Sequence, residues 1–378
     1  MNIDTKKYHI TNVISDNTDY KIIAYLTTEI IKIISNSPVD EYKEKYVHEF
    51  LYNNIHRLTA SFNEKLIFVY DEIISVEILT FIHTWFSKQS CDIENIIFIS
   101  THTLGMKKWY NDYLKLYGSI GFKVIEATWM TLLMWESSRL STLTAPPKGI
   151  DNRKLKHYFS YYGGTRSTLE QDALTALVLT RKKFGSIEYM GKFKSDPDQF
   201  DAYLEQITNF KNRELADQLL DIYKNSKLID HKGSVRCEGF TYSGTQWEID
   251  SRSLCQILRE TATDIPYSIV TEKTFRTFIH FQIPMPLSGI NSVENLESLG
   301  FKFCHDLIDY SYQYIPNFIT RVQGCLSQIN TLANNHSLGD LEEYILNNKD
   351  IFWHNYDRIA SRNAFDDIKS RIIKELND

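Results

Sequence analysis

The chain has 378 residues, of which 43% are apolar and 13% aromatic, and its formal net charge is -6. This composition excludes disordered, collagen-like and linker-like proteins, and the length favours two domains because single hydrophobic cores stop growing near ~250–300 residues. Dedicated nucleic-acid binders usually carry a basic excess, so the acidic balance argues mildly against that class.

The cysteines and the N-terminal segment favour a cytoplasmic protein. The five cysteines are odd in number and form no CxxC pair, which is typical of a reducing compartment and argues against a disulfide framework or a zinc ribbon. Residues 1–7 lack the apolar core of a signal peptide, and the most apolar stretch, 73–85, is interrupted by polar side chains. We therefore expect neither secretion by that route nor a membrane span.

The first predicted domain, residues 1–147, contains an alternation of strands and helices. The pattern predicts strands at 65–70, 95–100 and 123–127, and helices at 75–89 and 105–117. Strand–helix–strand order implies right-handed crossovers and a parallel sheet. Ligands on such sheets bind at the carboxyl ends of the strands, where the sequence places Asp71, Glu72 and His102. Alternatively, each of these three is an ordinary cap or loop residue.

Consecutive prolines, Pro146 and Pro147, mark the start of a second predicted α/β domain, residues 148–337. Its predicted elements are a strand at 157–162, helices at 168–183, 198–209 and 212–225, a turn-rich stretch at 232–246, a strand at 254–259 and a helix from about 272. Residues 338–378 are predicted to form charged helices, and the sequence leaves open whether these pack back on the first domain. The stretch 151–194 holds nine basic and four acidic side chains, a net charge of +5, which suits either an anionic ligand or a solvated face.

The segment Thr271-Glu272-Lys273 stands at the predicted turn between a strand and a helix. Thr271 is a suitable N-cap, because its hydroxyl could accept a hydrogen bond from a first-turn amide. Lys273 is unexpected there, since a cation in the first turn opposes the helix dipole at a cost of roughly 0.3–1 kcal/mol. An anion bound to the first-turn amides would make the interaction of Lys273 with the helix start favourable. The carboxylate of Glu272 suits the vicinal hydroxyls of a ribose. Alternatively, the segment is an exposed helix start with unrelated charges.

The same residues carry a resemblance to a known family. Thr271-Glu272-Lys273 after an apolar strand, with Glu260 upstream, resembles the donor-binding segment of fucosyltransferase-like glycosyltransferases of the GT-B type. Residues 284–287 look like the strand that follows the donor-binding helix in that family. Residues 163–166, 296–303, 309–312 and 354–355 resemble elements of a phage and marine-microbe branch of glycosyltransferase-like proteins. The resemblance covers about residues 155–365, whereas the first 145 residues match no family that we can name.

Several positions depart from the pattern of that branch. Tyr310 stands where a glutamate is expected, and Gln313 stands where an aspartate is expected. Phe303-Cys304 replaces a Thr-Phe pair, and the turn before Arg166 lacks the usual asparagine. These departures weaken the assignment of the family's residue roles at those positions and do not affect the Thr-Glu-Lys turn.

The resemblance implies two Rossmann-like domains facing a cleft, the GT-B arrangement, with helices at the C-terminus. It also implies transfer of a hexose or pentose from a nucleoside-diphosphate sugar, without a metal or another cofactor. The leaving diphosphate must be stabilised as its negative charge develops, and the resemblance implies that Arg166 and Lys273 do this. Arginine can grip a phosphate through two parallel hydrogen bonds. Alternatively, Arg166 forms a salt bridge to Glu170, four residues further along its predicted helix.

The remaining roles also follow from the resemblance. Glu272 would hold the ribose or the sugar, and Glu260 would hold a sugar hydroxyl. The general base for the acceptor hydroxyl would come from the first domain, with Asp71, Glu72 and His102 as the candidates at the strand ends. Alternatively, Glu260 is a solvated loop carboxylate.

The acceptor is left open by the sequence. The resemblance and the composition, rich in Asn, Ile, Lys and Tyr, indicate a viral protein acting in the host cytoplasm, so hydroxylated bases of phage DNA are one candidate and glycans are the other. The rival hypothesis is a non-catalytic nucleotide- or glycan-binding module on a transferase-like fold, because a fold does not determine a function. Asp196-Pro197-Asp198 has the form of a metal-binding DxD motif, but its proline predicts a turn, and no metal site is expected.

Overall fold

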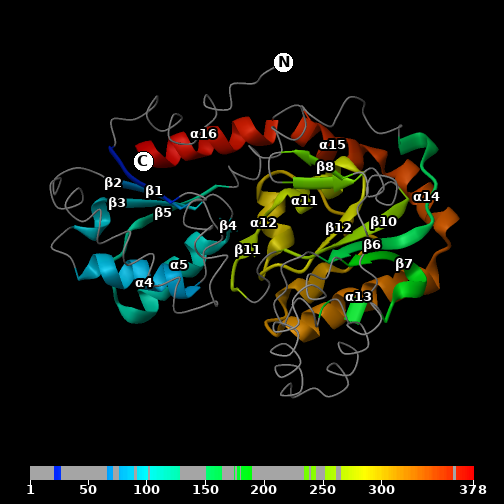
Figure 1. Ribbon diagram of the computed structural model, residues 1–378, viewed down its shortest axis with the longest axis horizontal. Coiled ribbons are helices and arrows are strands. Elements are labelled where there is room, and N and C mark those ends of the chain that lie inside the picture. The colour runs from blue at the N-terminus through cyan, green and yellow to red at the C-terminus, as the bar shows by residue number, and fades with distance from the viewer. Residues whose placement is uncertain are drawn as a thin grey trace. The chain divides into compact units, whose positions relative to one another are not determined.

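The structure is a computed structural model, and it describes residues 21–26, 66–70, 76–88, 92–100, 103–127, 150–163, 174, 177–178, 180–189, 234–237, 240–243, 252–260, 265–360 and 363–378. These residues form a mixed α/β protein with parallel sheets, as the sequence predicts. The chain divides into two compact units (Figure 1). Unit 1 comprises Met1–Ser137, Ile265–Glu272 and Asn363–Asp378, and unit 2 comprises Ser138–Asp264 and Lys273–Arg362.

Unit 1 contains a four-stranded parallel sheet with the spatial order β1-β2-β3-β5. Its strands are β1 (Lys21–Leu26), β2 (Leu66–Tyr70), β3 (Ile96–Ser100) and β5 (Lys123–Glu126). Helix α4 (Val76–Ser87) lies between β2 and β3 in the chain, and α5 (Met106–Tyr117) lies between β3 and β5. The predicted alternation is therefore confirmed, and β1 adds a strand that the sequence analysis does not predict. A short antiparallel pair, β4 (Thr103–Leu104) with β11 (Ser268–Ile269), completes the described strands of this unit.

The core of unit 1 joins α4, β3, α5 and β5 through buried apolar side chains. The ring of Phe122 stacks on that of Tyr110, with 4.6 Å between centroids, and lies 5.5 Å from that of Phe98. The Tyr110 hydroxyl is hydrogen-bonded to Nδ1 of His83 over 2.7 Å, so each of these two buried polar groups has a hydrogen-bond partner inside the core. Burial of each large side chain contributes about 1.5–3 kcal/mol, and the cluster therefore fixes α5 against the sheet.

Unit 2 contains a second four-stranded parallel sheet with the spatial order β12-β10-β6-β7 (Figure 1). Its strands are β6 (His157–Gly163), β7 (Gly185–Tyr189), β10 (Ser253–Leu258) and β12 (Ile283–Pro286). Since β7 follows β6 on one side and β10 follows on the other side, the winding of the sheet reverses between β6 and β10. A separate antiparallel hairpin, β8 (Ser234–Cys237) with β9 (Phe240–Ser243), lies in the stretch that the sequence indicates as turn-rich.

The strand predicted at 284–287 is confirmed as β12, although it contains two prolines. Pro284 and Pro286 are two residues apart, so their missing amide hydrogens fall on the same side of the strand. In the described sheet β12 pairs with β10 alone, and the edge of a sheet is where prolines are tolerated.

The predicted helix at 168–183 ends earlier than expected. Residues 174 and 177–178 are helical, but a turn follows at Thr180 and the 3-10 turn η4 (Lys182–Phe184) leads directly into β7. Gly185 opens that strand because a Cβ atom there would overlap the ring of Phe159 on the neighbouring strand. The strand β7 is not predicted from the sequence, because the basic residues 181–183 that precede it are equally typical of the end of a helix.

The other helices are α11 (Glu272–Ile279), α12 (Ser292–Ser298), α13 (Phe318–Asn335), α14 (Leu338–Asn347), α15 (Lys349–Ala360) and α16 (Asn363–Asn377), with 3-10 turns η2 (Ile93–Asn95), η3 (Ile150–Asn152) and η6 (Tyr310–Tyr314). Side chains cap α13 and α14: Asn317 accepts from the Thr320 amide, and Ser337 and Asp340 form a capping box. Within the described ranges, no helix combines the length and the apolar character needed to cross a membrane.

Candidate functional site

The carboxyl edge of the unit 2 sheet is the place where the fold predicts a ligand. In open α/β sheets, ligands bind outside the carboxyl ends of the strands at the point where the winding reverses. That point lies between β6 and β10. The two residues that follow β10, Arg259 and Glu260, are 4% and 1% exposed. Charged side chains are rarely buried to this degree unless they are paired.

Each oxygen of the Glu260 carboxylate contacts a residue of the first turn of α11. The Thr274 hydroxyl donates to Oε1 over 2.8 Å, and the Lys273 amine lies 3.7 Å from Oε2. The Lys273 side chain is 31% exposed, whereas that of Glu260 is 1% exposed. Glu260 is therefore not a solvated loop carboxylate, and the fold brings two residues of the predicted donor site into one ion pair.

Further polar side chains fix α11 on the sheet. The Thr277 hydroxyl donates to Oε1 of Gln256 on β10 over 2.5 Å, one helical turn from the Thr274 contact. The amide of Gln282, which follows α11, donates to the Ser160 hydroxyl on β6 over 3.0 Å. A buried hydrogen bond contributes about 0.5–1.5 kcal/mol, and its loss leaves a desolvated polar group, so these contacts define the register of α11.

The segment 296–303, which carries part of the family resemblance, packs against the same helix. Phe278 on α11 stacks on Phe301 with 4.5 Å between centroids and 3° between the ring planes. On the other side, Asn355 of α15 forms two hydrogen bonds with the Lys302 backbone, and His354 is hydrogen-bonded to the Gly300 carbonyl. The segments 296–303 and 354–355 thus act as a support that holds α11 in place.

Gln313, which stands where the related pattern has an aspartate, has a structural role. Its Oε1 accepts from the Val293 amide over 2.7 Å at the start of α12, and its Nε2 donates to Glu294 over 3.2 Å. An ionised aspartate could accept but not donate, so the amide suits this position better. Nearby Asp309 accepts from the Ser311 amide and caps η6. Both residues therefore support the fold.

Thr271 is buried, 7% exposed, and immediately precedes α11, which begins at Glu272 as the sequence predicts. The side chain of Glu272 lies outside the described residues. Asp71, Glu72, His102 and Arg166 lie entirely outside the described residues.

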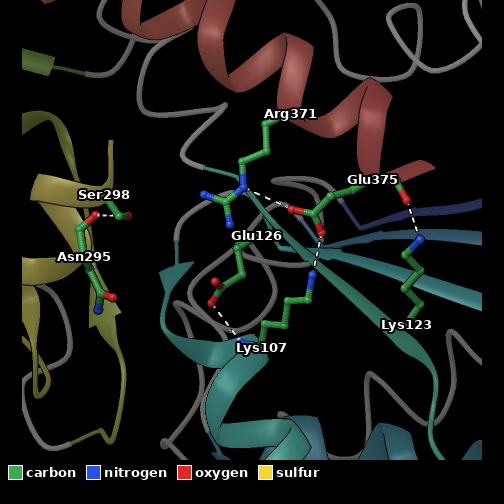
Figure 2. A network of polar contacts seen from close by, with 7 residues as sticks. All are labelled: Lys107, Lys123, Glu126, Asn295, Ser298, Arg371 and Glu375. Atoms are coloured by element: carbon green, nitrogen blue, oxygen red, sulfur yellow. Dashed lines mark hydrogen bonds and ion pairs between the residues drawn. The ribbon is translucent and has the colours of Figure 1, made fainter. Parts of the chain in front are cut away.

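Unit 1 has its own buried carboxylate at a strand end, which the sequence analysis does not single out. Glu126 is the last residue of β5, and its Oε1 accepts from the Lys107 amide over 2.9 Å at the start of α5 (Figure 2). Burial raises the pKa of Glu126, whereas hydrogen bonds from the amides of Lys107, Gly105 and Met106 and the charge of Arg371 act to lower it. The signal for this residue was its place at the carboxyl end of the third predicted strand.

The side chain of Lys107 belongs to a second network that ties α16 to the sheet of unit 1 (Figure 2). The Lys107 amine donates to Oε2 of Glu375 over 2.7 Å, Arg371 donates to Oε1 over 3.0 Å, and the Lys123 amine donates to the Glu375 carbonyl. Burial acts to raise the pKa of Glu375, but the hydrogen bonds from Lys107 and Arg371 outweigh it, so the pKa is lowered. This network joins residues near the chain terminus to the first sheet.

The described cysteines do not supply a nucleophile. Cys255, Cys304 and Cys325 are free and buried in unit 2. Burial raises the pKa of the Cys304 and Cys325 thiols to about 12, so both remain protonated at neutral pH, and the thiolate is the reactive form. In the described ranges, no group of three or more His, Cys, Asp or Glu side chains is placed to hold a metal ion.

The arrangement at the start of α11 combines a lysine whose side chain is 31% exposed with a helix N-terminus, where backbone amides and the helix dipole favour negative charge. Comparison of the chain with protein-family models, with curated proteins and with solved structures finds no match.

Proposed function

We propose that the protein is a glycosyltransferase that moves a sugar from a nucleoside-diphosphate sugar to an acceptor hydroxyl. The observation that carries this proposal is the ion pair between Lys273 at the start of α11 and the buried Glu260 after β10, at the reversal of the unit 2 sheet. The resemblance of the same residues to GT-B donor-binding segments supports it. We further propose that the two units are Rossmann-like domains of the GT-B type and that the protein acts in the cytoplasm, that of the host if it is viral.

In this proposal the donor is held mainly by the segment around α11. Lys273 stabilises the diphosphate as negative charge develops on it, and Arg166 supplies a second cation. Glu272 accepts hydrogen bonds from the ribose hydroxyls, and Thr271 caps the helix whose first turn faces the phosphates. Because cations and helix amides neutralise the leaving group, the reaction needs no metal ion in this scheme.

The acceptor would be activated by a base from the first domain, with Asp71, Glu72 and His102 as the proposed choices. The proposed acceptor belongs to one of two classes, a hydroxylated base in DNA or a glycan. Titration with duplex DNA at several salt concentrations distinguishes them, because phosphate contacts make DNA affinity fall steeply with salt. Binding to DNA without any salt dependence, or no binding at all, would leave the glycan as the proposed acceptor.

The direct test is turnover of UDP-sugars and GDP-sugars, including slow hydrolysis, by the wild type and by Lys273→Ala and Glu272→Ala. We expect both variants to lose most of the activity while keeping the fold, as judged by circular dichroism. Full activity in both variants would show that the donor site is wrongly placed. Binding of the nucleotide sugar without any turnover would favour the rival function, a non-catalytic nucleotide- or glycan-binding module.

A further inference from the structure

The buried carboxylate of Glu260 stands beside the amine that is proposed to bind the donor diphosphate. Its distance from the Lys273 amine, 3.7 Å, is longer than a direct hydrogen bond, and the lysine side chain is 31% exposed. The Lys273 side chain therefore lies beside Glu260 and also reaches solvent, from which a phosphate can approach it. The carboxylate itself is held in place, because the buried Thr274 hydroxyl donates to its other oxygen over 2.8 Å.

A fixed negative charge at this place acts on every phosphate that Lys273 binds. A nucleoside-diphosphate sugar carries two negative charges on its diphosphate, whereas the free nucleoside diphosphate carries up to one more, since a terminal phosphate ionises a second time near about pH 6. The carboxylate therefore repels the free diphosphate more strongly than the sugar ester. Its burial leaves this repulsion less screened by water and salt than a surface charge would be.

We infer that Glu260 is a specificity-determining residue that makes the site favour the intact nucleotide sugar over the nucleoside diphosphate left after transfer. This inference rests on the proposed function and refines it, because Glu260 then acts through its charge beside Lys273 and not through the sugar-hydroxyl contact that the family resemblance implies. For the enzyme, the consequence is weaker inhibition by its own product.

The test is Glu260→Gln, which keeps the size of the side chain and an oxygen that can accept from Thr274 but removes the charge. Dissociation constants for UDP, GDP and their sugar esters are measured by calorimetry at pH 8, where the terminal phosphate is fully ionised. We expect binding of the free diphosphate to tighten by about tenfold and binding of its sugar ester to tighten less, on the order of threefold. The preference for the sugar ester should therefore fall.

Two other outcomes would overturn the inference, and they are distinguished by which of the two ligands loses affinity. If the variant binds the sugar ester more weakly and the free diphosphate unchanged, Glu260 contacts the sugar directly. If both ligands lose affinity by the same factor, Glu260 only holds Lys273 in position. If the wild type binds neither kind of ligand, the proposed function fails together with the inference, and this result is distinct from both.

A matched control is available on the same helix. Thr277→Val removes the hydrogen bonds of the Thr277 hydroxyl to Gln256 on β10 and to the Lys273 carbonyl, without changing any charge. It should leave the ratio of the two dissociation constants unchanged, and an equal change in this control would mean that the effect comes from the position of α11. If Glu260→Gln does not fold, Glu260→Asn offers a second neutral side chain that can still accept a hydrogen bond, and the ratio of its two dissociation constants is compared in the same way.

Discussion

Both units place a buried glutamate at the carboxyl end of a strand, next to the start of a helix, but they satisfy it differently. In unit 1, Glu126 accepts hydrogen bonds from backbone amides at the start of α5. In unit 2, Glu260 is contacted by the side chains of Lys273 and Thr274 in the first turn of α11. The first arrangement is a helix cap supplied by a neighbouring strand, whereas the second pairs a buried carboxylate with a half-exposed cation.

The difference shows why a carboxylate at a strand end is not sufficient to indicate a ligand site. Glu126 fills the positively polarised start of α5 with the protein's own negative charge, so that helix start is occupied internally. The neighbouring Lys107 turns its amine away to Glu375. At α11 the lysine itself meets the strand-end glutamate and remains partly exposed to solvent.

The comparison predicts its largest effect for the two lysines. Lys273→Ala should lower glycosyl transfer by about 100-fold or more, the usual cost of removing one group that stabilises transition-state charge. Lys107→Ala, at the corresponding place in unit 1, should leave activity within about twofold and cost less than about 1 kcal/mol of stability, because it removes a partly exposed salt bridge. Steady-state kinetics and urea unfolding of both variants check this, and a large loss of activity in Lys107→Ala would contradict the contrast.

The sequence predicts the elements of both units better than their contacts. The strands at β2, β3, β5 and β10 and the start of α11 were predictable because short apolar runs and helical spacing are local signals. β7 was missed, since the need for Gly185 arises from Phe159 on the neighbouring strand and has no local signal.

The site was predictable in part for the same reason. Lys273 could be chosen from its place near a helix start and Glu260 from the family resemblance, but their pairing depends on β10 lying next to α11, which the sequence does not show. Glu126 looked like an ordinary strand residue, because only the fold brings it to the amides of α5. The role of Gln313 likewise depends on the Val293 amide, distant in the chain.

A second prediction concerns stability. Glu126→Ala should destabilise unit 1 by about 1–3 kcal/mol, because amides at the start of α5 lose a buried acceptor. Thr274→Val in unit 2 should cost about 1.5–3 kcal/mol, because the buried carboxylate of Glu260 loses its hydroxyl donor. Urea unfolding followed by circular dichroism measures both. A loss below about 0.5 kcal/mol in either variant would show that the carboxylate and its partner contribute little to stability.

The smallest predicted effect is a difference in pH dependence between two carboxylates of unit 1. Burial raises the pKa of Glu126 above its ordinary value of 4.5, whereas hydrogen bonds from Lys107 and Arg371 hold that of Glu375 below it, despite an opposing effect of burial. A raised folded-state pKa gives stability that is present below the ordinary value and is lost as pH rises through the folded value. A lowered one gives stability that is present above the ordinary value and is lost as pH falls through the folded value.

The stability of the wild type relative to Glu126→Gln should therefore fall as the pH rises above about 4.5, and its stability relative to Glu375→Gln should be lost as the pH falls below about 4.5. Urea unfolding of the three proteins at several pH values gives the two slopes. Slopes of the same sign would mean that the amides of α5 outweigh the burial of Glu126. In that case the folded protein would stabilise the charged form of Glu126. The contrast between Glu126 and Glu260 would then rest only on the activities of the Lys107 and Lys273 variants.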